Sequence, residues 1–367
     1  MNPEELRARL RALPKVELHR HLEGALRLDS LWEFHQSAQA SLHASREALE
    51  AAVTIPAGEP PGFRAFLARF AALRFRYGTI ADLERVGREA VADAAADGII
   101  AYELRFAPLF WAWRAREMPA MVSLADLPLP PFEAVEAATE ALMRGAFAEA
   151  ARRGVLVSCT VALNRQVPAA ANALQTKLLE RPLGAKLAAV DVCGDEACPL
   201  ESVAEFLEAW RRAERGITLH AGEDPDGPGA ANVREALERF GAVRIGHGVR
   251  AAEDPAVVRL LKSRGATLEV CPTSNVQTRA AASFEAHPLK ALHEAGVRVT
   301  VNSDDPTISA VDLTEEYARA HERCGVPLEA LREMAIQAAR ASFFPEAERA
   351  ELAKRIATAW DAFLLER

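Results

Sequence analysis

Residues 16–24 read VELHRHLEG, an apolar run that leads into two histidines separated by a single residue. In a β-strand, side chains at positions i and i+2 lie on the same face. We therefore expect His19 and His21 to project together from the end of a strand that begins near residue 16. Two imidazoles on one face are suitable ligands for a borderline metal such as Zn²⁺, although the pair alone does not identify a metal site.

Seven further apolar runs of strand length follow, and helical patterns alternate with them. The expected strands cover 16–21, 99–106, 155–161, 187–193, 216–220, 243–247, 267–271 and 298–303. Most are continuously apolar, as expected of parallel strands that are buried on both faces. The expected helices include 81–97, 132–153, 200–213 and 255–264. Eight strand–helix units predict an α/β fold of the (β/α)₈ TIM-barrel type, with a doubly wound sheet as the alternative.

The 367 residues are expected to form a single barrel domain over 1–367, with a helical insertion at about 24–98 after the first strand. One part of this insertion places Phe63, Phe66, Leu67 and Phe70 at helical spacing on one apolar face. This face either packs against the barrel or forms an apolar lid over an active site.

Composition excludes several classes of protein. The net charge is −8 and no basic run is interleaved with aromatics, so we expect no nucleic-acid partner. No uncharged apolar stretch approaches the length of a membrane span, and the first residues predict an amphipathic helix rather than the apolar region of a signal peptide. The five cysteines fit no zinc-finger spacing, and a reducing cytoplasm is the expected location.

Several expected strands end in metal-binding side chains. In a (β/α)₈ barrel the active site lies at the carboxyl ends of the strands. His220 ends the fifth strand and Asp304 follows the eighth, so both are expected beside the two histidines of the first strand. Three imidazoles and one carboxylate, with a position left for water, predict a catalytic zinc site.

Other polar residues at the same strand ends are candidates for proton transfer. Glu223 follows His220 in a glycine-containing turn and could protonate a ring nitrogen or a leaving group. His247 lies between two glycines and could act on the water, and Asp305 could contact the substrate. The alternatives are structural: a helix-start residue for Glu223, a core histidine for His247 and a helix cap for Asp305.

Over nearly its whole length the chain resembles the adenosine deaminase family of zinc hydrolases. The matching segments, in matching order and spacing, are PKVELHRHLEG (14–24), DVCGDE (191–196), ITLHAGED (217–224), RIGHG (244–248), EVCPTSN (269–275) and VTVNSDDP (299–306). The resemblance implies a (β/α)₈ barrel that removes the 6-amino group of adenosine or 2′-deoxyadenosine by hydrolysis. The products would be inosine or 2′-deoxyinosine, and ammonia.

The same resemblance implies roles for individual residues. One Zn²⁺ per chain would be bound by His19, His21, His220 and Asp304. Glu223 would donate a proton to purine N1, and His247 would orient the zinc-bound water and help to deprotonate it. Asp305 would contact N7, and the backbone N–H of Gly194 would contact N3.

Glu23 departs from the family pattern. Adenosine deaminases usually carry Asp at this position, where it contacts the ribose 5′-hydroxyl, whereas relatives that act on free adenine tend to carry Glu. The run Gly194-Asp195-Glu196 is instead typical of nucleoside enzymes. Free adenine and a nucleoside altered at its 5′ position, such as 6-amino-6-deoxyfutalosine, therefore remain alternative substrates.

Aromatic residues in two places give further expectations. By the resemblance, Phe66 and Phe70 would belong to the family's apolar lid. Phe110, Trp111 and Trp113 are expected to pack within a surface insertion, and the alternative is that they line an enlarged substrate pocket.

A different class of function is a catalytically inactive barrel that retains metal and purine binding. Nothing in the sequence favours it, because no expected catalytic position is lost. The oligomeric state is left open.

Overall fold

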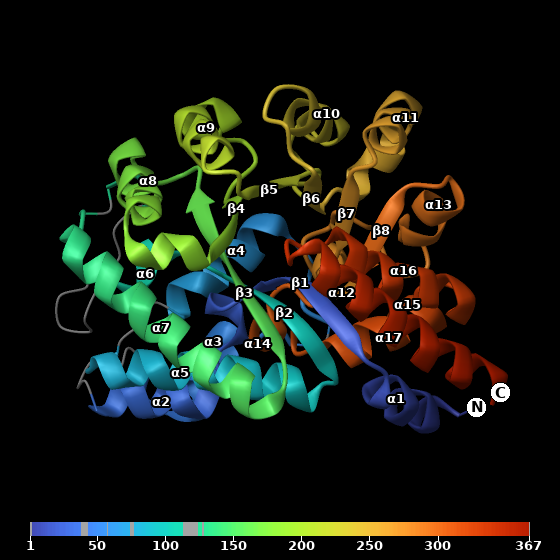
Figure 1. Ribbon diagram of the computed structural model, residues 1–367, viewed down its shortest axis with the longest axis horizontal. Helices are drawn as coiled ribbons and strands as arrows, with labels where there is room; N and C mark the ends of the chain where they lie inside the picture. Colours follow the sequence, from blue (N-terminus) through green and yellow to red (C-terminus); the bar gives the residue numbers. More distant parts are fainter. Residues whose placement is uncertain are drawn as a thin grey trace.

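Eight parallel strands form one continuous sheet at the centre of the computed structural model, in the order β1 to β8 (Figure 1). Their bounds are β1 Lys15–His21, β2 Ile99–Phe106, β3 Leu156–Asn164, β4 Leu187–Cys193, β5 Gly216–Ala221, β6 Arg244–His247, β7 Thr267–Val270 and β8 Arg298–Val301. The structure describes residues 2–37, 43–56, 58–73, 77–112, 124–126 and 128–366.

The sheet closes on itself where the segment after β8 meets β1. The backbone N–H of His21 donates to the carbonyl of Asp304 at 2.9 Å, and the N–H of Asp304 donates to the carbonyl of His19 at 2.8 Å. This closure confirms the (β/α)₈ barrel and shows that the doubly wound alternative is wrong. It also brings the first and last metal-ligand candidates of the sequence side by side.

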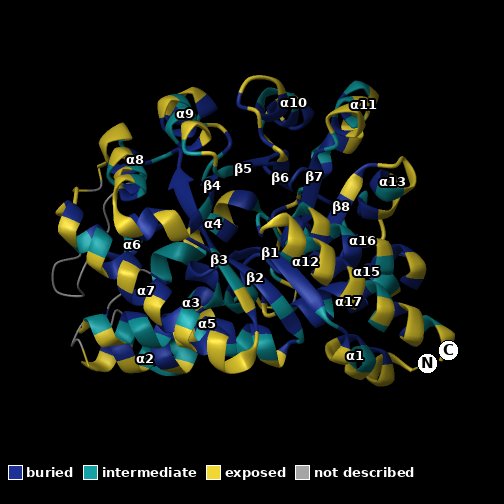
Figure 2. Cartoon of the chain, in the orientation of Figure 1, coloured by how far each residue is buried: buried dark blue, intermediate teal, exposed yellow. Residues whose placement is uncertain are grey.

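The strands are buried on both faces, as their continuous apolar runs predict. All residues of β1, β6 and β7 are buried, and Figure 2 shows the central strands in the buried colour and the outer helical faces as exposed. A parallel sheet needs cover on both faces, which here come from the barrel interior and the surrounding helices.

The helices follow the sequence pattern closely. Their bounds are α1 Pro3–Ala12, α2 Leu28–Ser37, α3 Arg46–Val53, α4 Phe63–Ala72, α5 Ile80–Ala96, α6 Pro108–Trp111, α7 Phe132–Arg153, α8 Ala169–Thr176, α9 Ala204–Arg212, α10 Ala230–Glu238, α11 Pro255–Arg264, α12 Pro272–Gln277, α13 Leu289–Glu294, α14 Pro306–Ser309, α15 Leu313–Glu322, α16 Leu328–Ala341 and α17 Glu346–Leu365. The expected helix at 200–213 is divided into a 3₁₀ turn, Leu200–Val203, and α9.

The segment between β1 and β2 contains α2 to α5, and α5 packs along α7 on the outside of the barrel. The helix α4 is attached to its neighbours by polar contacts. The Arg69 guanidinium donates to the carbonyl of Ala51 at 3.0 Å, and the N–H of Gly62 donates to the carbonyl of Gln277 at 2.8 Å. These contacts connect α4 to α3 and α12.

Two further features bear on the surroundings of the protein. Within the described ranges, every helix is too short or too polar to cross a membrane. The five cysteines are all free thiols.

Candidate metal centre and active site

A cavity of about 420 Å³ lies at the carboxyl end of the strands, where the sequence predicts the active site. Of the expected site residues, all except His19 line it directly: His21, Glu23, Phe66, Phe70, Gly194, His220, Glu223, His247, Asp304 and Asp305. His19 lies beneath the cavity floor, fully buried, with its ring centroid 5.3 Å from that of His21. The chain therefore gathers residues at, or just after, the ends of β1, β4, β5, β6 and β8 around one cavity.

Three imidazoles and one carboxylate converge at the floor of the cavity. Nε2 of His21 lies 3.3 Å from Nε2 of His220, and Nε2 of His19 lies 3.3 Å from Oδ1 of Asp304. The same oxygen of Asp304 lies 3.7 Å from Nε2 of His21. Gly246 makes room for this cluster, because a Cβ at that position would lie 2.9 Å from Cε1 of His19.

Two buried carboxylates orient the histidine rings from behind. Glu269 contacts Nδ1 of His19 at 2.8 Å, and Asp191 contacts Nδ1 of His220 at 3.0 Å. The Arg105 guanidinium bridges them, 2.6 Å from Glu269 and 3.2 Å from Asp191. Such contacts hold Nδ1 as the protonated nitrogen and direct the Nε2 lone pair of each ring toward the cavity.

These orienting residues were missed by the sequence analysis. Asp191 and Glu269 each stand as a single acid within an apolar strand, and Arg105 stands within another. A charged residue in a buried strand requires a partner, and that signal could have identified all three.

The donor set fits a divalent metal ion. The candidate ligand atoms of His19, His21 and His220 all lie within 4.8 Å of one another, as do those of His19, His247 and Asp304. Nε2 of His19 is buried and makes no hydrogen bond within the described part of the chain. Burial, with His220 nearby, lowers the pKa of His21 well below its ordinary value, so its ring is neutral and has a free lone pair. Neutral imidazoles and one carboxylate are typical zinc ligands.

Glu223 and His247 face each other on one side of the cavity. Oε2 of Glu223 lies 3.4 Å from Nε2 of His247, which in turn lies 3.9 Å from Oδ2 of Asp304. Burial, together with the carboxylate of Asp304, raises the pKa of Glu223 well above its ordinary value. Burial lowers the pKa of His247 well below its ordinary value. A neutral carboxylic acid beside a neutral imidazole is an arrangement suited to proton transfer.

The alternative structural role for Glu223 is wrong, because α10 begins only at Ala230 and Glu223 lies in the preceding loop. This loop is held by Glu196, another residue without a role in the sequence analysis. Its carboxylate accepts the backbone N–H groups of Gly222 at 2.8 Å and of Glu223 at 2.6 Å.

Asp305 occupies the N-cap position of α14, but its side chain accepts no capping hydrogen bond there. Its carboxyl group instead lines the cavity, and burial with the adjacent Asp304 raises its pKa well above the ordinary value. Gly24 permits this position, since a Cβ on residue 24 would lie 1.8 Å from Oδ1 of Asp305. The position of Asp305 therefore requires a glycine at residue 24.

The aromatic residues after β2 correct the sequence expectation. Trp111 is 1% exposed and donates its indole N–H to Oε1 of Glu23 at 2.7 Å, and Phe110 lines the cavity. Phe110 therefore lines the cavity, as the alternative expectation has it, whereas Trp111 is buried behind Glu23 and does not line the cavity itself. Trp113 lies outside the described residues.

Helix α4 forms an apolar wall of the cavity. Phe63, Phe66 and Phe70 line it, and the rings of Phe66 and Phe70 lie 6.4 Å apart. The apolar face read from the sequence thus points at the site rather than at the barrel exterior.

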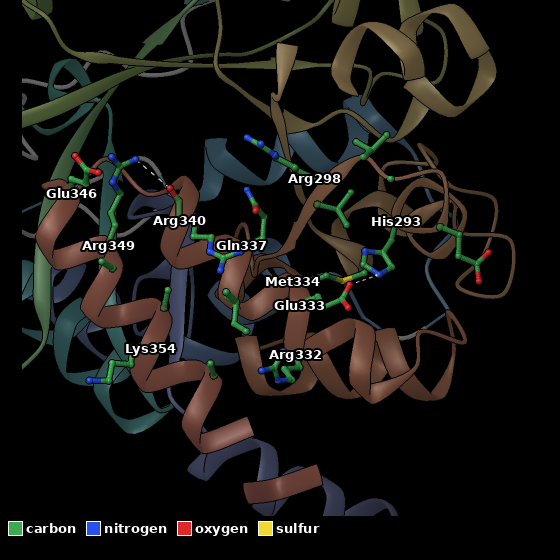
Figure 3. A pocket seen from close by; sticks show the side chains of 18 residues that line it. His293, Arg298, Arg332, Glu333, Met334, Gln337, Arg340, Glu346, Arg349 and Lys354 are labelled. Atoms are coloured by element: carbon green, nitrogen blue, oxygen red, sulfur yellow. Dashed lines mark hydrogen bonds and ion pairs between the residues drawn. The ribbon is translucent and has the colours of Figure 1, made fainter. Parts of the chain in front are cut away.

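A larger cleft of about 1160 Å³ lies at the opposite end of the barrel, between β8, α13, α16 and α17 (Figure 3). Charged side chains of both signs line it, and His293 pairs there with Glu333 at 3.2 Å. Among the described residues it contains no group of three metal-binding side chains, so the smaller cavity is the candidate active site.

A closed parallel barrel with histidines and an aspartate converging at its carboxyl end defines the class of metal-dependent amidohydrolases. Comparison with known proteins identifies the family within that class. Residues 14–359 match the family model described as adenosine deaminase, and the chain belongs to the adenosine deaminase family.

Individual relatives agree with this assignment. The chain is 32% identical over 350 residues to an adenosine deaminase from Aliivibrio fischeri, covering 94% of this chain and 97% of the relative. Among solved structures, an amidohydrolase from Burkholderia ambifaria with bound zinc matches with a TM-score of 0.83 and 23% identity over 97% of this chain and 93% of the other. An adenine deaminase from Arthrobacter aurescens matches with a TM-score of 0.79 and 25% identity over 96% and 100%.

Proposed function

We propose that this protein is a zinc-dependent hydrolase that deaminates adenosine and 2′-deoxyadenosine, giving inosine or 2′-deoxyinosine and ammonia. The observation that carries this proposal is that Glu223, with its raised pKa, faces His247 at 3.4 Å across a cavity whose floor is the histidine–aspartate cluster. The relatives named adenosine deaminase support the same reaction.

The zinc would be held, one ion per chain, by His19, His21, His220 and Asp304. When bound, the metal supplies the Lewis acidity that activates water near neutral pH. The zinc in the Burkholderia ambifaria structure supports this choice of metal. Glu269 and Asp191 would fix the ring orientation of two of the ligands from behind.

Glu223 would act as the acid of the reaction. Carbon 6 of a purine becomes electrophilic when the ring nitrogen beside it is protonated, so the enzyme needs a carboxyl group that retains its proton near neutral pH. Burial and the adjacent negative charge of Asp304 favour that form of Glu223. His247 would face the attacking oxygen on the other side of carbon 6.

Two further groups would orient the purine. Asp305, whose pKa is also raised by burial and by Asp304, would share a hydrogen with N7. The backbone N–H of Gly194 would contact N3, and a positive φ of 98° there turns the peptide in a way that favours glycine. Phe66 and Phe70 would cover the base and exclude water as an apolar lid.

The second candidate function is deamination of free adenine or of a 5′-altered nucleoside such as 6-amino-6-deoxyfutalosine. It is favoured by Glu23, whose longer side chain extends toward α6 rather than ending where an aspartate would. The similarity to an adenine deaminase adds to this alternative.

The five free thiols favour a reducing, cytoplasmic location for the protein.

The test is a comparison of kcat/KM for adenosine, 2′-deoxyadenosine, adenine and 6-amino-6-deoxyfutalosine with the zinc-loaded protein. Specificity is the ratio of these values. We expect the two nucleosides to exceed adenine by at least about 10²-fold, because a ribose adds binding contacts that free adenine lacks. A higher kcat/KM for adenine or for the futalosine derivative would show that adenosine is the wrong substrate, while hydrolytic deamination would remain the reaction.

A further inference from the structure

A chain of three hydrogen bonds leads from the backbone at α13 to the ring of His247. The backbone N–H of Leu289 donates to Nδ1 of His287 at 3.1 Å. Nε2 of His287 contacts Oδ1 of Asn275 at 3.3 Å, and Nδ2 of Asn275 contacts Nδ1 of His247 at 2.9 Å. All three side chains are at least 95% buried.

The direction of every bond in this chain follows from its first member. A backbone N–H can only donate, so Nδ1 of His287 is an acceptor and carries no hydrogen. Burial lowers the pKa of His287 to about 4, so the ring is neutral and its single hydrogen lies on Nε2. That hydrogen requires an acceptor, which is Oδ1 of Asn275. The amide group of Asn275 then donates, and Nδ1 of His247 accepts.

We propose that Asn275 and His287 are positioning residues that place a hydrogen on Nε2 of His247, so that this ring faces the substrate as a hydrogen-bond donor. With Nδ1 accepting from Asn275, the hydrogen of the neutral His247 ring must lie on Nε2. Nε2 carries a hydrogen in the protonated ring as well.

Two carboxyl groups face Nε2, and one of them supports this tautomer. Oε2 of Glu223 lies 3.4 Å from it and Oδ2 of Asp304 lies 3.9 Å from it. The ionised carboxylate of Asp304 can only accept, so a hydrogen on Nε2 faces an acceptor there, whereas the protonated Glu223 agrees with either tautomer. His247 also has a positive φ of 58° at the end of β6, a backbone conformation that clusters at functional sites.

This inference rests on the proposed function and changes one step of it. The resemblance implies that His247 helps to deprotonate the attacking water, but a nitrogen that carries a hydrogen cannot accept that proton. His247 would instead donate to the attacking oxygen and stabilise its negative charge. The proton released by water would pass to the ionised carboxylate of Asp304, because Glu223 already carries the proton that it would give to the purine ring.

Nitrogen NMR of the ring tests the proposal directly. Histidine is labelled with ¹⁵N in the zinc-loaded protein, and the His247 signals are assigned by their loss in His247→Asn. We expect a pyrrole-type shift for Nε2 and a pyridine-type shift for Nδ1. A pyrrole-type Nδ1 with a pyridine-type Nε2 in the wild-type protein would overturn the proposal, whatever the protein's activity.

Two substitutions of His287 form a matched pair, because this residue does not line the cavity. In His287→Gln the amide can both accept from Leu289 and donate to Asn275, so the tautomer and most of kcat should be retained. In His287→Glu the ionised carboxylate can only accept, so Asn275 must turn and present its oxygen to His247. We expect the hydrogen to move to Nδ1 and kcat to fall about 10²-fold, as when one preorganised donor is removed.

The possible outcomes distinguish a failure of the tautomer proposal from a failure of the proposed deaminase function. If the wild-type protein deaminates adenosine but His287→Glu keeps both the tautomer and kcat, the inference fails and the proposed function stands. If the wild-type protein deaminates no 6-aminopurine, the proposed function fails, while the NMR result still decides the tautomer. Should His287→Glu not fold, the wild-type NMR and His287→Gln carry the test.

Discussion

Trp111 donates its indole N–H to Oε1 of Glu23 at 2.7 Å, and the same oxygen accepts the backbone N–H of Ala107, also at 2.7 Å. The pair connects the end of β1 to the helix that follows β2. Burial raises the pKa of Glu23, and the two donated hydrogen bonds oppose that rise. The residue that departs from the family pattern is thus held in place by a residue that the sequence analysis assigned to surface packing.

The substitution Trp111→Phe should therefore lower kcat/KM for nucleosides more than kcat/KM for free adenine. A hydrogen bond to a charged group contributes about 1.5–3 kcal/mol, so we expect kcat/KM for adenosine to fall about 10-fold or more. The value for adenine should change less than about 3-fold, because adenine has no group that extends toward Glu23. Steady-state kinetics with both substrates measures the difference.

A suitable control is Trp210→Phe, since Trp210 is fully buried in α9 and lies outside the site. An equal loss for adenosine and adenine in Trp111→Phe would show that the Glu23–Trp111 contact has no role in recognising the ribose.

Glu223→Gln should retain zinc and lose most turnover. Glutamine has nearly the same shape but no proton to donate to the purine ring, and general acid catalysis contributes about 10²–10⁴-fold. Metal analysis together with kcat checks both parts of the expectation. If Glu223→Gln turns over substrate about as fast as the wild-type protein, Glu223 is not the general acid.

Asp191 links the candidate metal ligand His220 to the stability of the barrel. Burial opposes its ionisation, yet Arg105 and His220 hold the pKa of Asp191 well below its ordinary value. Breaking one partner of a buried ion pair costs about 3–5 kcal/mol, so Asp191→Asn should lower the unfolding free energy of the metal-free protein by about that amount at pH 7.

The pH dependence of this loss has a definite sign. The folded-state pKa of Asp191 lies below the unfolded value of about 4, so its contribution is present above that pH and is lost as the pH falls toward the folded-state pKa. Urea unfolding between pH 7 and pH 3 should show the two proteins converging below about pH 4. A difference that widens on acidification would contradict the expected pairing.

Arg64 on α4 reaches across the mouth of the cavity to three acids in the loops after β4 and β5. Its guanidinium lies 3.5 Å from Asp195, 3.8 Å from Asp224 and 3.9 Å from Asp226. Arg64 itself is exposed, and pairs of an exposed arginine contribute about 0.2–1 kcal/mol each, so we expect Arg64→Gln to raise KM about 3-fold with little change in kcat.

Ionic strength provides the check on Arg64. Salt should raise KM in the wild-type protein and have little effect in Arg64→Gln, since screening weakens exposed pairs. Arg144→Gln is the matched control: Arg144 is 56% exposed and pairs with Glu84 on α5 at 2.7 Å, away from the cavity. A salt response that is equal in all three proteins would exclude a role for the Arg64 ion pairs in substrate binding.

The sequence predicts the barrel well because its strands and helices are local patterns. The strand at 99–106 and the helix at 132–153 are found with the same bounds, and His19, His220 and Asp304 meet because strand ends in a barrel must meet. Contacts between distant residues are not encoded in such patterns. The Arg105–Glu269 pair, the Glu196 contacts and the His287–Asn275 relay each depend on tertiary placement, which only the structure provides.

The central claim is that the histidine–aspartate cluster holds zinc for deamination of a 6-aminopurine nucleoside. The most direct measurement combines zinc content with ammonia release from adenosine, in the wild-type protein and in His19→Ala. We predict one zinc per wild-type chain with one ammonia per inosine formed, and loss of both zinc and turnover in His19→Ala. A wild-type protein that binds zinc fully and releases no ammonia from any 6-aminopurine would contradict the account.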